Sequence, residues 1–241
     1  MREAGKISSR ALRLAGEAVQ PGVSTWEIER LVREFIEKQG AVPTFLGYGG
    51  FPASSCISVN NVVIHGIPSK DAVIRQGDIV SIDIGATYEG FVGDNAWTFP
   101  CGDVSQEAQA LMDATREALF EGIQAARPGN RIGDIGSTVQ RYVEARGYSV
   151  VRDFVGHGVG AKMHEDPSVP NYGTPGRGVR LLPGMTIAIE PMINAGVKEV
   201  KVLKDGWTTV TADGKLSAHF EHSVAITENG PVTVSYTHLR A

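Results

Sequence analysis

The sequence repeats itself at one fixed offset, and this repeat constrains the fold more than any other feature. Gly77 aligns with Gly184, and Asp83 aligns with Glu190, both at an offset of 107 residues. The same offset aligns three further places without a gap: Pro21-Gly22 with Pro128-Gly129, Ile28 with Ile135, and Gly40 with Gly147. The sequence therefore predicts two related halves, residues 1–106 and 107–234, each a helix pair followed by strands.

The strand that carries the aligned acid has one polar and one apolar face. Because successive strand residues point to opposite faces, Ser81 and Asp83 share one face while Val80 lies on the other. We expect helices to cover the apolar face. If the halves pack symmetrically, Asp83 and Glu190 meet at the centre of a single domain over residues 1–241. An extended array of repeats is the alternative arrangement.

Composition excludes several classes of protein. The chain has 241 residues and a formal net charge of −4, which argues against a nucleic-acid binder that works through phosphate contacts. It has no run of about 18 apolar residues, so no membrane span is expected, and no signal peptide precedes the first predicted helix. The two cysteines, Cys56 and Cys101, are too few for a disulfide scaffold, so a cytoplasmic protein is expected.

Apolar spacing predicts four helices, at residues 2–19, from 24 to the stop at 40, 105–126 and 135–145. The second opens with a capping-box pattern, Ser24 to Glu27. Strands are predicted at residues 55–59, 62–66, 149–154, 185–190 and 218–226, together with a hairpin over 79–94 that closes with 96–99. The strand at 149–154 leads into a glycine-rich strand end at 156–160. A β-ribbon is predicted over 192–216, a loop over 167–178 and a peripheral tail at 235–241.

Four acids fall in predicted strands: Asp83, Asp94, Glu190 and Glu221. Taken singly, Asp94 reads as a solvated hairpin end and Glu221 as an exposed edge-strand residue, whereas apolar residues flank the other two. Converging carboxylates repel one another unless cations neutralise them. With His157, which lies among glycines, they offer only oxygen and nitrogen ligands. This set suits two divalent ions, namely manganese, iron(II), cobalt or zinc.

Several short motifs, in a fixed order, carry a resemblance to a known family. They are HGIP at 65–68, SIDIG at 81–85, GD at 93–94, GHGVG at 156–160 followed by His164, TIAIEP at 186–191 and FEH at 220–222. In these motifs the chain resembles the type I methionine aminopeptidases. The resemblance implies an α+β pita-bread fold, in which two helix-pair-plus-strands halves surround a central curved antiparallel sheet.

The resemblance also implies roles for particular residues. The metal ligands would be Asp83, Asp94, His157, Glu190 and Glu221, with Asp94 and Glu221 bridging two metals. His65 and His164 would contact the substrate and take part in catalysis, and Glu190 would also carry a proton. The methionine pocket would be lined by Phe45, Tyr48, Phe51, Cys56, Met163 and Trp207. His222 is not a family ligand, and strand alternation turns it away from Glu221.

The substrate implied by the resemblance is the N-terminal methionine of a new chain or peptide, before a small second residue. A cytoplasmic monomer that contacts the ribosome transiently is expected, without nucleic-acid or membrane binding. One alternative is a proline-directed peptidase of the same fold, of the prolidase or aminopeptidase P type. Another is a non-catalytic peptide-binding module, although all five ligand positions are filled. Family members usually begin several residues earlier, and residues 235–241 do not resemble the usual ending.

Overall fold

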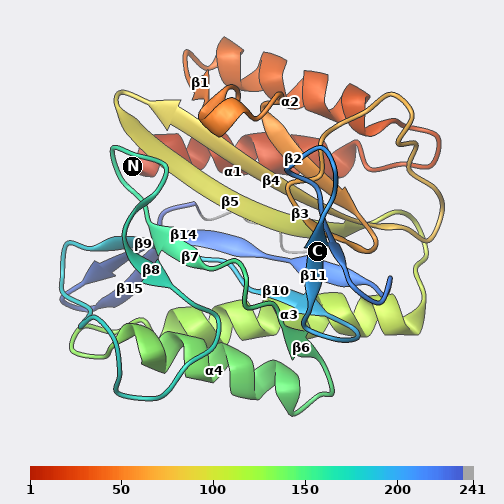
Figure 1. Cartoon of the computed structure of the whole chain (residues 1–241). Helices are drawn as coiled ribbons and strands as arrows, with labels where there is room; N and C mark the ends of the chain where they lie inside the picture. Colours follow the sequence, from red (N-terminus) through yellow and green to blue (C-terminus); the bar gives the residue numbers. More distant parts are fainter. Residues whose placement is uncertain (236–241) are drawn as a thin grey trace.

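The computed structural model describes residues 1–235 and has four helices in two pairs. The helices are α1 (Arg2–Glu17), α2 (Thr25–Lys38), α3 (Gln106–Ala125) and α4 (Ile132–Glu144). One pair lies above the strands and the other below them (Figure 1). All four predicted helices are present, and α4 begins at Ile132 rather than at residue 135. Apart from Ser235, the predicted tail lies outside the described residues.

A curved nine-stranded sheet lies between the helix pairs, and all its pairings are antiparallel. Its strands are β1 (Val42–Pro43), β2 (Ser55–Val59), β4 (Ile79–Tyr88), β5 (Phe91–Pro100), β7 (Gly156–Gly158), β8 (Glu165–Val169), β9 (Thr186–Ile189), β14 (Glu221–Thr227) and β15 (Gly230–Thr233). The order is β1-β4-β5-β14-β9-β7-β8, with β2 on β4 and β15 on β14. This architecture confirms the predicted α+β pita-bread class.

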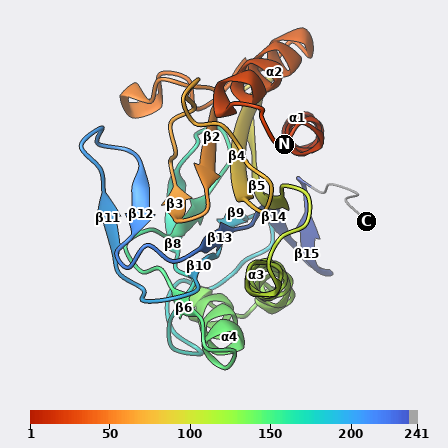
Figure 2. The same cartoon turned by 90° about the vertical axis from the view of Figure 1, so that its right-hand side faces the viewer.

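Two three-stranded sheets complete the strand layer. One has the order β13-β10-β6 and the other the order β11-β12-β3. Their strands are β3 (Val62–Ile64), β6 (Ser149–Val150), β10 (Met192–Asn194), β11 (Val200–Val202), β12 (Thr209–Thr211) and β13 (Ser217–His219). The predicted ribbon is confirmed in β11 and β12, which stand out to one side of the molecule in Figure 2.

Each helix pair buries its apolar stripe against its own part of the large sheet. Helices α1 and α2 share a core with β4, and α3 and α4 share another with β9 and β14. Trp97 of β5 packs against both cores. Helix α1 comes very close to β5 because Gly93 has no side chain; a Cβ there would lie 2.4 Å from the Ala4 carbonyl carbon. The tight contact fixes β5 and the acid it carries.

The strand predicted over 218–226 is present but interrupted, because the backbone changes partners at Phe220. Before it, β13 pairs with β10, and after it β14 pairs with β5 and β9. The Thr98 hydroxyl contacts both the carbonyl oxygen of His219, at 2.8 Å, and its amide nitrogen, at 3.0 Å. A side chain thus replaces a strand partner at the break, which residue alternation alone does not reveal.

Other boundaries also differ from prediction, among them the strand expected over 62–66, which ends at Ile64. The strand expected over 149–154 ends at Val150, because β10, its partner, is only three residues long. The loop expected over 167–178 begins inside β8, which pairs Gly156 with Val169. Strand β15 was not predicted. Among residues 1–235, no helix combines the length and apolar character needed to cross a membrane.

Candidate metal centre and its pocket

Strand register brings three acids onto one face of the large sheet. Asp83 of β4 lies opposite Ala96 of β5, and Ala96 lies opposite Glu221 of β14. Asp94 precedes Ala96 by two residues and therefore points to the same face. Ala96 is too small to separate its neighbours, so the three carboxylates converge above it.

Glu190 and His157 reach the same point from the second half of the chain. Glu190 directly follows β9, and His157 is the central residue of β7. The Nε2 of His157 lies 3.6 Å from Asp94 Oδ2 and 3.5 Å from Glu190 Oε1. Its Nδ1 lies 2.8 Å from the Gly158 carbonyl oxygen. Because a carbonyl only accepts, Nδ1 carries the ring proton and Nε2 presents a lone pair to the acids.

The acid cluster contains buried oxygens that nothing in residues 1–235 satisfies. Asp83 Oδ1, Asp94 Oδ1 and Glu221 Oε1 are all buried without a hydrogen-bond partner. One ligand atom each from Asp94, His157 and Glu221 lie within 4.8 Å of one another. Unpaired buried anions are costly, and a cation removes that cost. The oxygen-rich donor set with one imidazole therefore fits a divalent metal.

Burial and mutual repulsion shift the pKa values of these groups in the metal-free protein. Burial raises the pKa of Asp94 to about 7. Burial, and then the charge of Asp94, raise the pKa values of Asp83, Glu190 and Glu221 well above their usual range. Burial lowers the pKa of His157 to about 4, so its ring is neutral at pH 7. Such opposed shifts in one cavity are typical of a functional site.

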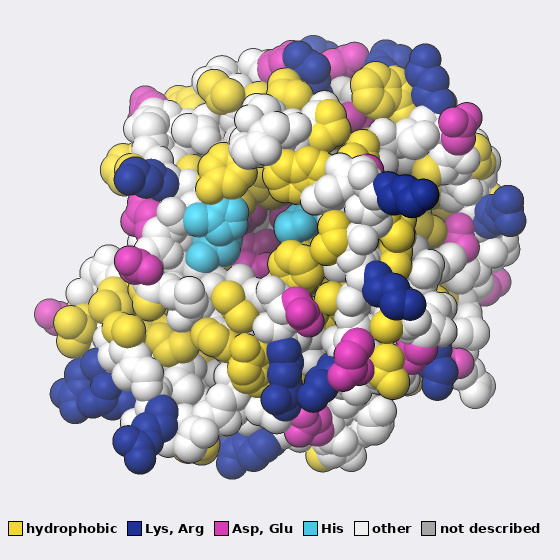
Figure 3. Space-filling view, viewed as in Figure 1, with side chains coloured by type: hydrophobic (Ala, Val, Ile, Leu, Met, Phe, Trp, Pro, Cys, Tyr) yellow, Lys and Arg dark blue, Asp and Glu magenta, His cyan; other side chains and the backbone are white. Residues whose placement is uncertain are grey.

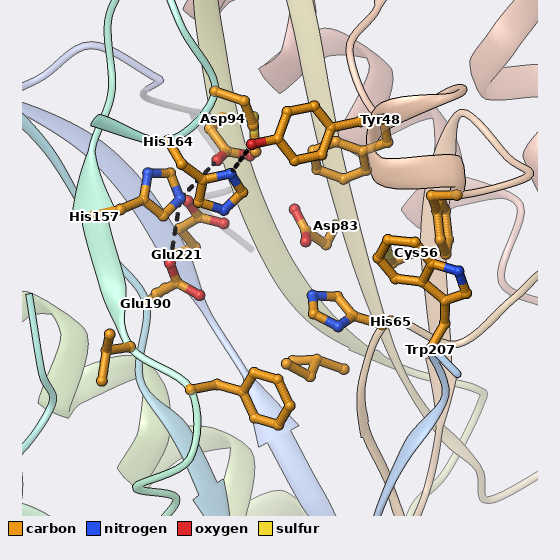
Figure 4. Close-up of a pocket in the computed structure, with 16 residues that line it drawn as sticks. Tyr48, Cys56, His65, Asp83, Asp94, His157, His164, Glu190, Trp207 and Glu221 are labelled. Carbon is orange, nitrogen blue, oxygen red and sulfur yellow. Dashed lines mark hydrogen bonds and ion pairs between the residues drawn. The ribbon is translucent and has the colours of Figure 1, made fainter. Parts of the chain in front are cut away.

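The acids open into a pocket of about 170 Å³. Figure 3 shows acidic side chains deep in a hollow, with histidines at its sides and hydrophobic side chains around it. All six residues predicted to form the methionine pocket line it: Phe45, Tyr48, Phe51, Cys56, Met163 and Trp207. The Phe51 and Trp207 rings meet edge to face, with centroids 5.2 Å apart. The acid cluster and the apolar wall thus face one shared space (Figure 4).

Cys56 belongs to the pocket wall and is poorly suited to act as a nucleophile. In the pairing of β2 with β4 it lies opposite Asp83. Burial, and next the charge of Asp83, raise the pKa of the Cys56 thiol well above its usual value. The reactive species is the thiolate, so a raised pKa keeps this cysteine inert.

Two further histidines that were predicted to contact substrate line the same pocket. His65 has a left-handed backbone, with φ of 56°, which is strained for a residue with a side chain. Burial lowers the pKa of His65 to about 4 and also lowers that of His164. His164 lies against His157, with ring centroids 4.2 Å apart. Both rings therefore face the acid cluster as neutral hydrogen-bonding groups.

Sequence reasoning gave no role to His219, which lies beside the cluster. Its Nε2 is buried, has no hydrogen-bond partner within residues 1–235, and lies 3.8 Å from Glu190 Oε2. Its place two residues before Glu221 could have indicated that both side chains lie on the same face. His222 points to the other side, as predicted, where its ring lies near Trp97 and Phe120. Three further lining residues, Ile64, Phe154 and Val155, were not predicted.

The fold and site define the class of this protein: it belongs to metallopeptidase family M24, whose model matches residues 1–228. It is therefore a hydrolase that uses divalent metal. Among its relatives, a methionine aminopeptidase from Clostridium perfringens is 58% identical over 231 residues, which are 96% of this chain and 92% of that protein. The crystal structure of a methionine aminopeptidase from Thermotoga maritima superposes with a TM-score of 0.97, at 48% identity, over 98% of this chain and 95% of that one.

Proline-directed peptidases are similar to this chain at a greater distance. The crystal structure of a prolidase from Pyrococcus horikoshii has a TM-score of 0.79 at 24% identity. The match covers 99% of this chain but only 61% of the prolidase. This likeness establishes a common fold and nothing about the substrate.

Proposed function

We propose that this chain removes the N-terminal methionine from peptides and new proteins whose second residue is small. One observation carries the proposal: an apolar, aromatic pocket opens directly onto a buried cluster of metal-binding side chains. A side chain held in the pocket brings the adjoining peptide bond to that cluster. The relatives support the same substrate, because a protein 58% identical to this chain is named a methionine aminopeptidase.

The proposed metal ligands are Asp83, Asp94, His157, Glu190 and Glu221. Five ligands with four carboxylates suit two divalent ions, for which manganese, iron(II), cobalt and zinc are the candidates. When bound, such a pair supplies Lewis acidity, which acidifies water and polarises a carbonyl group. Asp94 and Glu221 would serve both ions, and strand register supports this by bringing them onto one face, with Glu221, the first residue of β14, opposite Ala96 of β5.

The remaining chemistry falls to the side chains around the cluster. Glu190 is the proposed proton carrier, because its pKa is raised and its carboxylate lies at the pocket. We assign to His164, a neutral imidazole that lines the pocket, the donation of an N–H to the carbonyl oxygen as negative charge develops there. To His65 we assign a hydrogen bond to the amide of the bond that breaks. The aromatic walls exclude water from these groups.

The apolar wall explains a preference for methionine. An unbranched thioether adapts to an irregular space, and sulfur–aromatic contacts are worth about 0.3–1.5 kcal/mol each. Phe45, Phe51 and Trp207 supply the aromatic edges for such contacts. Within residues 1–235, these three wall residues offer a charged side chain no counter-ion. A substrate at the start of new proteins also fits a cytoplasmic monomer that meets the ribosome transiently.

The proposal is tested by stripping the protein with chelator and restoring manganese, cobalt, iron(II) or zinc separately. We expect metal-dependent release of methionine from Met-Ala-Ser and no cleavage of a non-methionine Xaa-Pro dipeptide. Cleavage of the Xaa-Pro peptide alone would replace the proposal with a prolidase-type activity. A folded protein that retains little metal and cleaves neither peptide would indicate a non-catalytic peptide-binding module.

A further inference from the structure

A hydrogen bond joins two pocket residues that are far apart in the sequence. The Tyr48 hydroxyl lies 2.8 Å from Nδ1 of His164, and the ring centroids lie 5.3 Å apart with planes inclined by 30°. Tyr48 begins a short 3-10 helix, Tyr48–Gly50, and His164 directly precedes β8. Figure 4 shows the bond running from the Tyr48 side of the pocket to the His164 side, with the second nitrogen of His164 turned into the pocket.

We propose that Tyr48 is a positioning residue for His164: its hydroxyl donates to Nδ1 and thereby keeps the ring proton on Nε2, inside the pocket. A neutral imidazole carries one proton, and the bond made at one nitrogen decides which nitrogen holds it. The second-shell partner thus selects the tautomer, as it does for metal-bound histidines. The opposite arrangement, with Nδ1–H donating to the phenol oxygen, would leave an acceptor in the pocket.

Chemistry favours the phenol as the donor. A phenol O–H, with a pKa near 10, is a stronger acid than a neutral imidazole N–H, and an imidazole nitrogen is a better acceptor than a phenol oxygen. Within the aromatic loop, the contact is specific to one residue. Phe45 and Phe51 line the pocket without a polar atom, and the loop residue that faces an imidazole is the one that carries a hydroxyl.

The tautomer matters because of the role proposed for His164. Only an Nε2–H can donate to a carbonyl oxygen that gains negative charge, so losing this proton from the pocket weakens the stabilisation of the transition state. The consequence for catalysis rests on the proposed function, whereas the position of the proton does not. Tyr48 would then influence turnover more than the binding of the methionine side chain.

The kinetic test compares matched tyrosine-to-phenylalanine changes in the metal-loaded protein. Tyr48→Phe keeps the ring in the pocket and removes only the hydroxyl; we expect kcat on Met-Ala-Ser to fall about ten-fold while KM changes less than about two-fold. Tyr142→Phe, on α4 and outside the lining of the pocket, controls for the chemical change and leaves both constants as in the wild type. Phe51→Leu, in the wall, is expected to raise KM instead.

The direct test is the tautomer itself, read from long-range ¹H–¹⁵N NMR correlations of the zinc-loaded protein at about pH 8, where an unperturbed histidine is neutral. His164→Asn identifies the His164 signals. We expect a protonated Nε2 and an unprotonated Nδ1 in the wild type, and a mixture or reversal in Tyr48→Phe. Neither Tyr142→Phe nor Phe51→Leu should change this pattern.

Each result bears on the proposal separately from the peptidase activity. A wild-type spectrum with the proton on Nδ1 would overturn it, whatever the variants do. So would an unchanged tautomer in Tyr48→Phe together with a raised KM and normal kcat, since Tyr48 would then be only a wall. If the wild type released no methionine, the proposed function would fail while the NMR result still decided the role of Tyr48.

Discussion

The two aligned acids, Asp83 and Glu190, lie in different backbone settings. Asp83 is in the middle of the ten-residue β4, paired on one side with Cys56 and on the other with Ala96. Glu190 lies just beyond the four-residue β9, and its carbonyl oxygen is held by the side chain of Asn171 at 3.0 Å. One half of the molecule therefore presents its acid from a fixed ladder, and the other from a strand end. A mid-strand carboxylate suits a metal ligand, and we expect the carboxylate at the strand end to take part in proton transfer as well.

The second helix of each pair is also anchored differently. On α2, Glu29 is buried and accepts hydrogen bonds from the backbone amides of Ser54, at 2.7 Å, and Ser55, at 2.9 Å. The aligned residue on α4 is Gly136, where the backbone itself comes close; a Cβ there would lie 2.3 Å from the carbonyl oxygen of Tyr172. Helix α2 is therefore held to its neighbouring segment by a carboxylate, whereas α4 packs directly against its neighbour because the residue there has no side chain.

The largest effect is expected at the fixed hairpin. Asp94→Ala removes a central ligand from β5 and should lower kcat/KM for methionine release by about 10³-fold or more, because losing even an outer-shell partner costs about 10–100-fold. Circular dichroism should show an intact fold, and metal analysis a loss of bound metal. Asp113→Asn, a change at a partly exposed acid on α3 that pairs with Arg116, is the control. Wild-type turnover in Asp94→Ala would refute the metal centre.

The aligned acids should respond differently to the same chemical change. Asp83→Asn should mainly weaken metal binding, by about 10–100-fold, because the fixed ligand is lost. Glu190→Gln should reduce kcat about 100-fold at saturating metal, because proton transfer is lost as well. Isothermal titration with metal and steady-state kinetics separate the two effects. Identical profiles for both variants would show that the strand-end setting has no catalytic meaning.

The helix anchors give a smaller effect, on stability. Glu29→Ala leaves two buried backbone amides and the Ser55 hydroxyl, which lies 2.5 Å from the carboxylate, without their acceptor. The change should lower the free energy of unfolding by about 3–4 kcal/mol. Urea denaturation measures the change. Glu34→Ala, on the exposed face of the same helix, is the control and should change stability by less than about 0.5 kcal/mol. Equal costs for the two would contradict the anchoring role.

The smallest effect concerns the helix starts, where the aligned residues are Ser24 and Arg131. Both backbone amides donate to an acid three residues on: Glu27 at 2.8 Å and Asp134 at 2.7 Å. Only Ser24 also caps through its side chain, accepting from the Glu27 amide. Ser24→Ala should therefore lower the free energy of unfolding, measured by thermal denaturation, by about 1 kcal/mol, and Arg131→Ala should lower it clearly less. A greater loss for Arg131→Ala would contradict this reading.

Much of the fold was accessible from sequence because the signals were local or repeated. Local sequence patterns were enough to predict three features: the capped helix start at Ser24, the helices with an apolar stripe, and the apolar strand that carries an acid. The partner switch at Phe220 was missed because it depends on Thr98, far away in the chain. Strand β8 was missed because Asp166 and Pro167 are poor strand residues, held there by pairing with β7.

The candidate site also has a part that the sequence predicts and a part that depends on contacts between distant segments. The acids could be proposed from sequence, since a carboxylate between apolar residues needs a partner. Their convergence over Ala96 could not be derived without the register of three strands. The contact of His219 with Glu190 and the bond between Tyr48 and His164 also join distant segments, so no local pattern indicates them. The single-domain organisation and the functions of the site residues stay predictions.

The position of Trp97 between the two cores couples the unfolding of the two helix layers. Its indole packs against both cores and stacks edge-on with Phe220, at a centroid distance of 4.7 Å. Neither helix layer can separate from the sheet without exposing this ring, so the energetic cost of opening one layer is shared with the other. The two helix layers should unfold together in one cooperative transition, and the fluorescence of Trp97 should report the loss of both layers.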